Sequence, residues 1–324
     1  MLKKGVRTSF CPDIAVLDAT LRDGGLCNDF FFSDAFVKAL YEANVKAGVD
    51  YMEFGYKADP DIFPEDAFGK WKFCKDADIR EIVGENRTGM KISVMADVGR
   101  CNYRRDILPK AESPIDMVRI ATYLHTIPKA IEMIGYCAAQ GYETAVNIMA
   151  VSTANTEDLD EAFELLAQTP VKAVYLVDSY GALYPAQIGE LVEKYRKIAA
   201  FYGKGVGIHT HNNQQLAFAN TIEAITRGAM MLDCTVNGIG RGAGNCSTEL
   251  LISYLKNPRY HLTPVLRFIE EYMLPLKESG VQWGYALPYL CTGRLNQHPR
   301  TAIAAMKEGR TDYAYFNLTL MDRE

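Results

Sequence analysis

The segment that decides the fold reads AVYLV at residues 173–177, continues through an amphipathic stretch at 188–199, and ends with VGIH at 206–209. The two apolar runs are short and contain β-branched residues, so each predicts a strand. Because they are apolar without alternation, we expect both faces of each strand to be buried, as in a parallel sheet. The stretch between them has apolar residues at helical spacing. The segment therefore predicts a strand–helix–strand unit.

The same alternation recurs along most of the chain. Other predicted strands lie at 14–17, 51–54, 92–95, 117–120, 145–149 and 231–235, and helical patterns at 35–43 and 216–226. Ser33 or Asp34 can cap the first of these helices. Alternating strands and helices form either an open doubly wound sheet or a closed barrel. Eight units within about 255 residues fit the usual size of a barrel, so we expect an α/β fold of the (β/α)₈, or TIM barrel, type.

The pattern changes after the eighth predicted strand and its helix. We expect residues 1–256 to form the catalytic barrel and residues 257–324 to form a short C-terminal helical extension packed on it. Helical spacing at 265–273 and 301–306 supports this division. The long connection at 55–90 is expected to be an elaborated loop over the mouth of the barrel, where it could serve as a lid.

Composition excludes several classes of protein. The chain has 324 residues and a formal net charge of −5, with no basic stripe, so nucleic acid is not an expected partner. No apolar run approaches the roughly 18 residues of a membrane span, and the basic residues within 1–7 precede no apolar run of a secretory signal. The eight cysteines occur singly, which is typical of reduced thiols in a cytoplasmic protein.

Three polar clusters follow predicted strands. TLRDGG spans 20–25 after the first strand, HTHNN spans 209–213 at the end of the seventh, and GIGRGAGN spans 238–245 after the eighth. Closing a barrel places the first strand beside the eighth, which neighbours the seventh. The three clusters would then meet at the carboxyl end of the barrel, where barrel enzymes have their active sites.

This meeting point predicts a metal site. His209 and His211 lie two positions apart, so an extended strand points both imidazoles the same way. Asp23 and Asn245 would join them from the neighbouring strand ends. One carboxylate, two imidazoles and an amide oxygen suit a divalent metal. We expect Mn²⁺ or Mg²⁺ first, with Co²⁺ or Zn²⁺ as alternatives.

Each residue also has a simpler interpretation. Asp23 can cap a turn, Arg22 can be a surface cation, and Asn245 can be the N-cap of a helix that begins near Ser247. The glycines at 238–244 resemble a dinucleotide fingerprint, but they follow the last strand and have no acidic residue about 20 positions later. A tight glycine turn that positions Asn245 is the preferred interpretation.

Together, TLRDG at 20–24 and HTHN at 209–212 resemble the motifs of the metal-dependent carbon–carbon lyase barrels, the HMGL-like or DRE-TIM metallolyase superfamily. The resemblance covers roughly residues 12–255. Asn220, AGN at 243–245 with STE at 247–249, and DSYG at 178–181 are most similar to the 4-hydroxy-2-oxovalerate aldolase branch.

The resemblance implies a role for each matching residue. The implied roles are metal ligation by Asp23, His209, His211 and Asn245, binding of a carbonyl or enolate oxygen by Arg22, orientation of Arg22 by Glu53, and substrate contact by Asp178 and Ser179.

One position departs from the aldolase pattern. Those aldolases place a histidine base three residues after the metal aspartate, and here that position is Leu26. The proton must therefore move through another group, or the substrate differs. Candidate groups are His125 after the fourth strand, Tyr289 and His298 in the extension, and a water on the metal. We take His125 as a catalytic candidate and Tyr289 as a substrate-binding candidate, although His125 and His298 also fit ordinary surface or packed histidines.

These observations predict a carbon–carbon lyase that acts on a small 2-oxo acid, such as a 4-hydroxy-2-oxo acid, through a pyruvate-type enolate. One alternative is a synthase that condenses acyl-CoA with a 2-oxo acid, as isopropylmalate and homocitrate synthases do, although those enzymes have longer C-terminal regions. Another is a metal-dependent hydrolase, although amidohydrolase barrels carry their His-x-His motif on the first strand. A third is a barrel that binds a ligand without catalysis. The extension could also form a homodimer contact.

Overall fold

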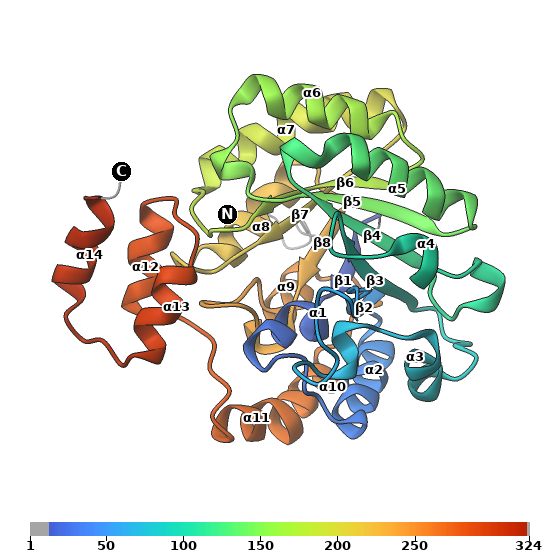
Figure 1. The fold of residues 1–324 in the computed structure, drawn as a ribbon, viewed down its shortest axis with the longest axis horizontal. Coiled ribbons are helices and arrows are strands. Elements are labelled where there is room, and N and C mark those ends of the chain that lie inside the picture. The colour runs from blue at the N-terminus through green and yellow to red at the C-terminus, as the bar shows by residue number, and fades with distance from the viewer. Residues whose placement is uncertain (1–12, 323–324) are drawn as a thin grey trace, which may run out of the picture.

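The computed structural model describes residues 13–322. Its eight strands form a closed parallel barrel in chain order (Figure 1). The residues within 1–7, on which the expectation of no secretory signal rests, lie outside this range. All eight predicted strands are confirmed, and the open sheet is excluded. The strands are β1 (Ala15–Asp18), β2 (Tyr51–Tyr56), β3 (Lys91–Asp97), β4 (Met117–Thr122), β5 (Glu143–Ile148), β6 (Ala173–Asp178), β7 (Gly205–Thr210) and β8 (Met231–Cys234).

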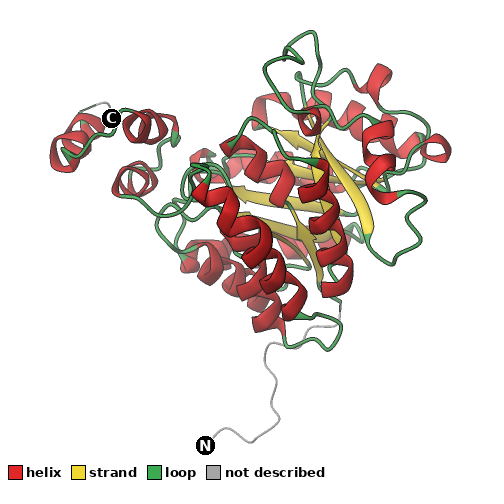
Figure 2. Cartoon of the chain, turned by 90° about the horizontal axis from the view of Figure 1, so that it is seen from below, coloured by secondary structure: helices red, strands yellow, loops and turns green. Residues whose placement is uncertain are grey.

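Helices surround the barrel (Figure 2). The helices predicted at 35–43, 188–199 and 216–226 are confirmed as α2, α7 and α8. Ser33 caps α2, since its hydroxyl accepts the backbone N–H of Phe36 at 3.2 Å. The barrel helices are α2 (Asp34–Ala47), α3 (Asp76–Val83), α5 (Ile127–Ala139), α6 (Thr156–Ala167), α7 (Pro185–Phe201), α8 (Ala217–Arg227) and α9 (Thr248–Leu255), with the short α1 (Thr20–Gly24) and α4 (Tyr103–Asp106).

The interior of the barrel has an apolar layer beneath an ionic layer. Met117 and Met231 belong to the buried apolar cluster inside the barrel. Two positions further along the same strands, and so on the same face, are the buried Arg119 and Asp233. Tyr175 supports this layer, because the guanidinium of Arg119 lies 4.3 Å from the centre of its ring. The strands therefore change from apolar to charged toward their carboxyl ends.

The long connection after β2 packs at the carboxyl end of the barrel. Trp71 within it is fully buried, and its Nε1 donates to the carbonyl of Phe32 at 3.3 Å. The backbone N–H of Gly69 donates to the carbonyl of Asp29 at 2.9 Å. This connection therefore lies against the segment that follows α1, at the expected end of the barrel. Its movement as a lid stays a prediction.

The C-terminal extension is helical, as predicted. Its first part packs on the barrel, since the rings of Phe36 in α2 and Phe268 in α10 lie 5.1 Å apart. The last three helices form a lobe at one edge of the barrel, on the left in Figure 1. The elements are α10 (Leu262–Phe268), a π-helical turn (Ile269–Met273), α11 (Leu274–Glu278), α12 (Leu287–Arg294), α13 (Arg300–Lys307) and α14 (Tyr313–Met321).

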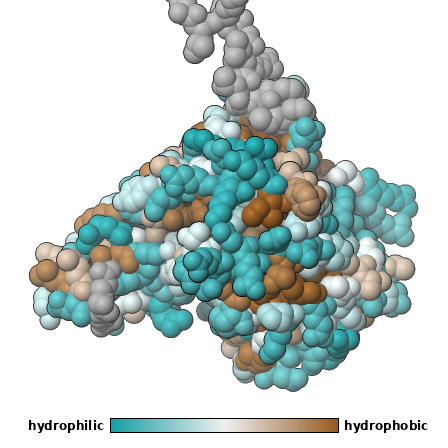
Figure 3. All heavy atoms as spheres, turned by 90° about the horizontal axis from the view of Figure 1, so that it is seen from above, coloured by the Kyte–Doolittle hydropathy of each residue, from teal (hydrophilic) through white to brown (hydrophobic). Residues whose placement is uncertain are grey.

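Hydrophobic side chains remain exposed on α14, among them Tyr315, Leu318 and Met321. Figure 3 shows apolar patches among the hydrophilic residues on one face of the molecule. The homodimer stays a prediction. The cysteines of the described part of the chain are free thiols, and no helix between residues 13 and 322 is long and apolar enough to cross a membrane.

A buried carboxyl at the end of β1 predicts a pH-dependent stability. Asp18 is fully buried, and burial raises its pKa to about 6. Because this pKa is higher in the folded chain than in the unfolded chain, the carboxyl stabilises the fold below about pH 4, and this contribution is lost as the pH rises through 6. Asp18→Asn cannot ionise. We expect its free energy of unfolding, relative to the wild type, to increase by about 3 kcal/mol between pH 4 and pH 7.

Urea unfolding in the presence of EDTA measures this difference. The control is Asp66→Asn, which changes an exposed carboxyl and should show no such trend. A difference between Asp18→Asn and the wild type that stays constant with pH would contradict the assignment.

Candidate active site

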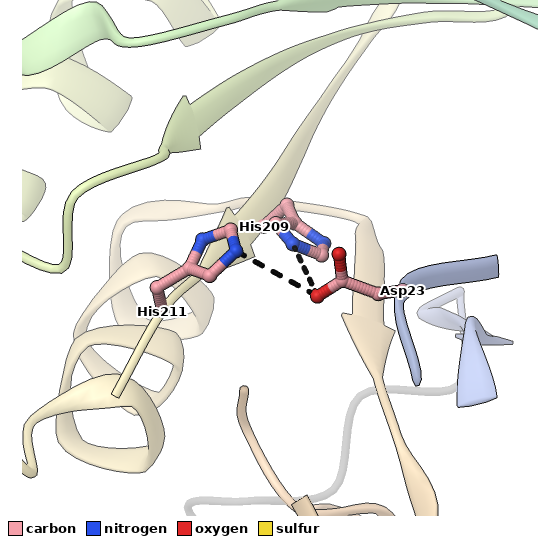
Figure 4. Close-up of side chains that lie close together, drawn as sticks. All are labelled: Asp23, His209 and His211. Atoms are coloured by element: carbon pink, nitrogen blue, oxygen red, sulfur yellow. Dashed lines mark ion pairs between the residues drawn. The ribbon is translucent and has the colours of Figure 1, made fainter. Parts of the chain in front are cut away.

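Asp23, His209 and His211 converge at the carboxyl end of the barrel (Figure 4). Asp23 lies on α1 after β1, His209 lies on β7, and His211 directly follows β7. The Oδ2 atom of Asp23 is 3.9 Å from Nε2 of His209 and 3.6 Å from Nε2 of His211. One potential ligand atom from each residue lies within 4.8 Å of the other two, and all three side chains are buried. The predicted meeting of the strand ends is confirmed.

Hydrogen bonds orient both imidazoles toward this point. Nδ1 of His209 lies 2.9 Å from a carboxylate oxygen of Asp233, and Nδ1 of His211 lies 3.1 Å from the backbone carbonyl of Asp178. Both partners can only accept, so each Nδ1 carries the proton and each Nε2 keeps its lone pair. The two Nε2 atoms are buried and have no hydrogen-bond partner in the described part of the chain. Two unpartnered acceptors beside a carboxylate are what a divalent cation would satisfy, so these residues fit a metal.

The protonation of the site also suits a metal. Burial lowers the pKa of His211 to about 3, although the negative charge of Asp23 acts to raise this pKa. Burial alone would raise the pKa of Asp23, but the positive charge of Arg22 beside it is the main cause that holds this pKa well below its usual range. At neutral pH, Asp23 is therefore a carboxylate and His211 a neutral imidazole, the forms that bind metal ions.

A network of buried charges surrounds the triad. Arg22 donates from Nε to Glu53 at 2.8 Å and from Nη1 to Asp23 at 3.0 Å. Arg119 donates to the same oxygen of Glu53 at 3.0 Å and to Asp233 at 2.6 Å. Asp233 in turn accepts from His209. The network therefore fixes both Arg22 and one of the imidazoles.

Arg119 and Asp233 are site residues that the sequence interpretation missed. Each is a charged residue within an otherwise apolar predicted strand, at 117–120 and at 231–235. A charge in such a position is costly unless it is paired. A charged residue within an apolar strand was therefore the signal available in the sequence, although it does not identify the residue that pairs with the charge.

The glycine turn after β8 positions Asn245. The side-chain amide of Asn245 donates to Oδ2 of Asp23. A Cβ atom at Gly240 would lie 2.7 Å from that same oxygen, and Gly244 adopts a φ of +81°, so the turn requires glycine at both positions. The alternative role of Asn245 as an N-cap is wrong, because the N-cap of α9 is Ser247. Its role as a fourth metal ligand stays a prediction.

The turn after β6 borders the triad. The carboxylate of Asp178 accepts the backbone N–H groups of Ala182 at 3.0 Å and Leu183 at 3.3 Å, so it holds the turn. The hydroxyl of Ser179 accepts the backbone N–H of Ala150 at 2.8 Å. Both oxygens of the Asp178 carboxylate are thus occupied, whereas the Ser179 hydroxyl keeps its proton for a further bond. Substrate contact by either residue stays a prediction.

The three candidate bases lie around the triad, and none of them forms a hydrogen bond or ion pair with it among the described residues. His125 is exposed on the turn Leu124–Thr126 and lines a pocket of about 330 Å³. Tyr289 on α12 packs against the turn after β8, where a Cβ atom at Gly242 would lie 3.1 Å from its ring. His298 lies beyond that turn, with Nε2 3.5 Å from a nitrogen of Arg241. The structure thus does not place His125 in the metal centre.

The triad predicts a metal-dependent stability. Saturating Mn²⁺ at about 100 times its Kd should stabilise the wild type by about 2.7 kcal/mol and raise its Tm by about 5 °C. His211→Ala removes one ligand, so we expect most of this increase to be lost relative to the metal-free Tm of the same variant. Differential scanning fluorimetry with EDTA and with Mn²⁺ measures both values. His125→Ala is the matched control and should keep the full increase; an equal increase in His211→Ala would exclude this residue as a ligand.

Comparison with known proteins agrees with this geometry. A sequence model of the HMGL-like family matches residues 13–267. A 4-hydroxy-2-oxovalerate aldolase from Pelotomaculum thermopropionicum is 30% identical over 253 residues, which cover 78% of this chain and 72% of that protein. An oxaloacetate decarboxylase from Mycobacterium tuberculosis is 30% identical over 254 residues, which cover 77% and 72%.

A solved structure extends the likeness to three dimensions. The N-terminal domain of a proposed aldolase from Bacteroides vulgatus superimposes with a TM-score of 0.74 at 28% identity, covering 90% of this chain and 96% of that one. The family match spans the whole barrel and includes all three residues of the triad. This chain therefore belongs to the HMGL-like family of metal-dependent lyases and aldolases, and it carries a buried Asp-His-His metal site.

Proposed function

We propose that this chain is an aldolase that cleaves a 4-hydroxy-2-oxo acid into pyruvate and an aldehyde. The observation that carries this proposal is the position of Arg22, which is buried and hydrogen-bonded beside the metal-site carboxylate of Asp23. The relatives named 4-hydroxy-2-oxovalerate aldolase support the substrate class.

The difficult step is the formation of a carbanion, which is accessible only as an enolate. A divalent metal held by Asp23, His209 and His211 would supply Lewis-acid stabilisation of the enolate charge. Arg22 would add a preorganised donor. Glu53 and Asp23 occupy its Nε and Nη1, which fixes the guanidinium and leaves its remaining N–H groups for a substrate oxygen. Such donors are most effective in a buried site because they need no reorganisation.

Aldol cleavage also requires a base. The proton of the C4 hydroxyl leaves, the C3–C4 bond breaks, and its electrons form the pyruvate enolate, which then takes a proton at C3. Leu26 occupies the position of the aldolase histidine and offers no base. Of the three candidates, His298 lies beside the turn after β8, and burial lowers its pKa to about 4, so its imidazole is neutral at pH 7.

The absence of a histidine at position 26 favours a second candidate function, the decarboxylation of oxaloacetate. In that reaction the C3–C4 bond breaks to release CO₂ and the same enolate, and no hydroxyl proton has to be removed. The relative named oxaloacetate decarboxylase supports this alternative. The two reactions share the metal, Arg22 and the enolate, and differ only in the group that leaves.

One experiment separates these functions. The protein with Mn²⁺ is incubated with 4-hydroxy-2-oxopentanoate or with oxaloacetate, and pyruvate, acetaldehyde and CO₂ are measured. We expect pyruvate and acetaldehyde from the first substrate. Release of CO₂ from oxaloacetate, with no cleavage of 4-hydroxy-2-oxopentanoate, would establish the decarboxylase. The rate must exceed the rate measured with the His211→Ala variant in the presence of Mn²⁺. Thiol release from acetyl-CoA with a 2-oxo acid would establish the synthase.

A ligand-binding barrel would catalyse none of these reactions. Failure with both substrates, together with no deuterium exchange at the methyl group of pyruvate in D₂O, would overturn the proposed function.

Arg22 provides a direct test of the enolate step. Arg22→Ala should reduce kcat by about 10²–10³, which is typical of losing one such donor. The Tm increase with Mn²⁺ should remain, because the three metal-site residues are unchanged. Steady-state kinetics and scanning fluorimetry measure the two effects. Arg104→Ala, which removes an exposed arginine, is the control; wild-type turnover in Arg22→Ala would remove this residue from the mechanism.

A further inference from the structure

Arg241 is a cation near the residues of the metal site. It lies in the glycine turn after β8, next to Gly240, whose Cα faces the carboxylate of Asp23. Its charge contributes to the low pKa of both Asp23 and His211. Arg22 is paired with three carboxylates and Arg119 with two. No carboxylate of the described residues lies within 4.0 Å of the Arg241 guanidinium.

The hydrogen bonds of Arg241 are also incomplete. Its Nη2 lies 3.4 Å from the backbone carbonyl of Ser179, and its Nη1 lies 3.5 Å from Nε2 of His298. Nδ1 of His298 already accepts the backbone N–H of Arg300 at 3.0 Å. The neutral ring therefore carries its proton on Nε2 and cannot accept from Arg241. The Nε atom of Arg241 is buried and has no hydrogen-bond partner among residues 13–322.

A half-buried guanidinium with one long hydrogen bond and no counter-charge is costly, unless a ligand supplies the missing acceptors. Its planar fork of donors matches the two oxygens of a carboxylate or a phosphate. We propose that Arg241 binds an anionic oxygen group of the substrate at the metal centre. This inference rests on the proposed function, since it takes the ligand to be the substrate of the same site.

The charges of the site favour the carboxylate of the 2-oxo acid itself. Imidazoles that bind a metal through Nε2 are neutral, so Asp23, Glu53 and Asp233 then carry three negative charges against the positive charges of Arg22 and Arg119. A divalent metal turns this into one net positive charge, and Arg241 adds a second. The enolate of pyruvate carries two negative charges, one on the carboxylate and one on the enolate oxygen. The positive charge of Arg241, together with that of the metal centre, therefore balances the two negative charges of the enolate.

The C-terminal extension takes part in this subsite. His298 lies between α12 and α13, and its ring packs 5.5 Å from that of Tyr180. These two rings lie beside Arg241 and the turn after β6. The extension thus encloses the guanidinium at one side of the mouth.

Oxalate tests the proposal, because it is a planar dianion that resembles the enolate of pyruvate. Its affinity for the Mn²⁺-loaded protein is measured by calorimetry in the wild type, Arg241→Gln and Arg241→Lys. We expect the Kd of oxalate to increase about 10- to 100-fold in Arg241→Gln and less in Arg241→Lys, which keeps the charge. Arg294→Gln, which removes an exposed cation of α12, should bind oxalate as the wild type does.

The affinity for Mn²⁺ distinguishes binding from a structural role. Removing a cation near Asp23 should leave the Kd of Mn²⁺ unchanged or lower it, because the charge repels the metal. A loss of Mn²⁺ binding in Arg241→Gln would mean that the residue holds the site together, and would overturn the proposal.

Substrates locate the anion. Arg241→Gln could bind oxalate normally and yet cleave 10- to 100-fold more slowly only those aldols whose aldehyde fragment carries a phosphate or carboxylate. In that case Arg241 binds the aldehyde fragment, and the result still supports an anion subsite. No change with oxalate or with either class of aldol would overturn it. A wild type that binds Mn²⁺ and oxalate but cleaves nothing would refute the proposed function alone, since the oxalate measurements would still test Arg241.

Discussion

A closed ring of buried charges is the feature on which the site depends. Each member is hydrogen-bonded or ion-paired to the next, except that Nε2 of His209 faces Oδ2 of Asp23 across the metal site at 3.9 Å. Leaving one buried charge without its partner typically costs about 3–5 kcal/mol, so the members hold one another in place. With neutral imidazoles the ring has one excess negative charge, which a divalent metal compensates. The members are Asp23, Arg22, Glu53, Arg119, Asp233 and His209.

Closure of the barrel brings the members of this ring together. β1 pairs with β8, and β8 pairs with β7, so residues from both ends of the chain face one interior. Arg119 spans that interior from β4, supported below by the ring of Tyr175. A Cβ atom at position 207 would lie 2.5 Å from this ring, so Gly207 provides the space that the layer needs. The apolar layer therefore supports the layer of charged side chains that packs on it.

The two candidate reactions have the enolate in common and differ in the group that leaves. In the proposed function, the triad and Arg22 stabilise an enolate, which aldol cleavage and decarboxylation both produce. Leu26, Arg241 and His298 are the residues that would distinguish these reactions and hold the substrate anion. The chain carries the Asp-His-His metal site of its family and differs from the aldolase pattern at position 26. On this proposal, the reaction depends on residues outside the metal site as well as on the metal.

The sequence alone determined the order of strands and helices, and from it the barrel, because the apolar spacing of each element is a local property. It also determined the triad, since Asp23, His209 and His211 occupy recognisable motifs at strand ends. Only the tertiary structure decided that Arg119 pairs with Asp233, 114 positions away, and that Asn245 contacts Asp23 and does not cap α9. It also showed that His125 forms no hydrogen bond or ion pair with the triad. It alone left Arg241 without a counter-charge. Such pairings depend on side chains brought together across the barrel, and no local pattern of residues encodes the distance between them.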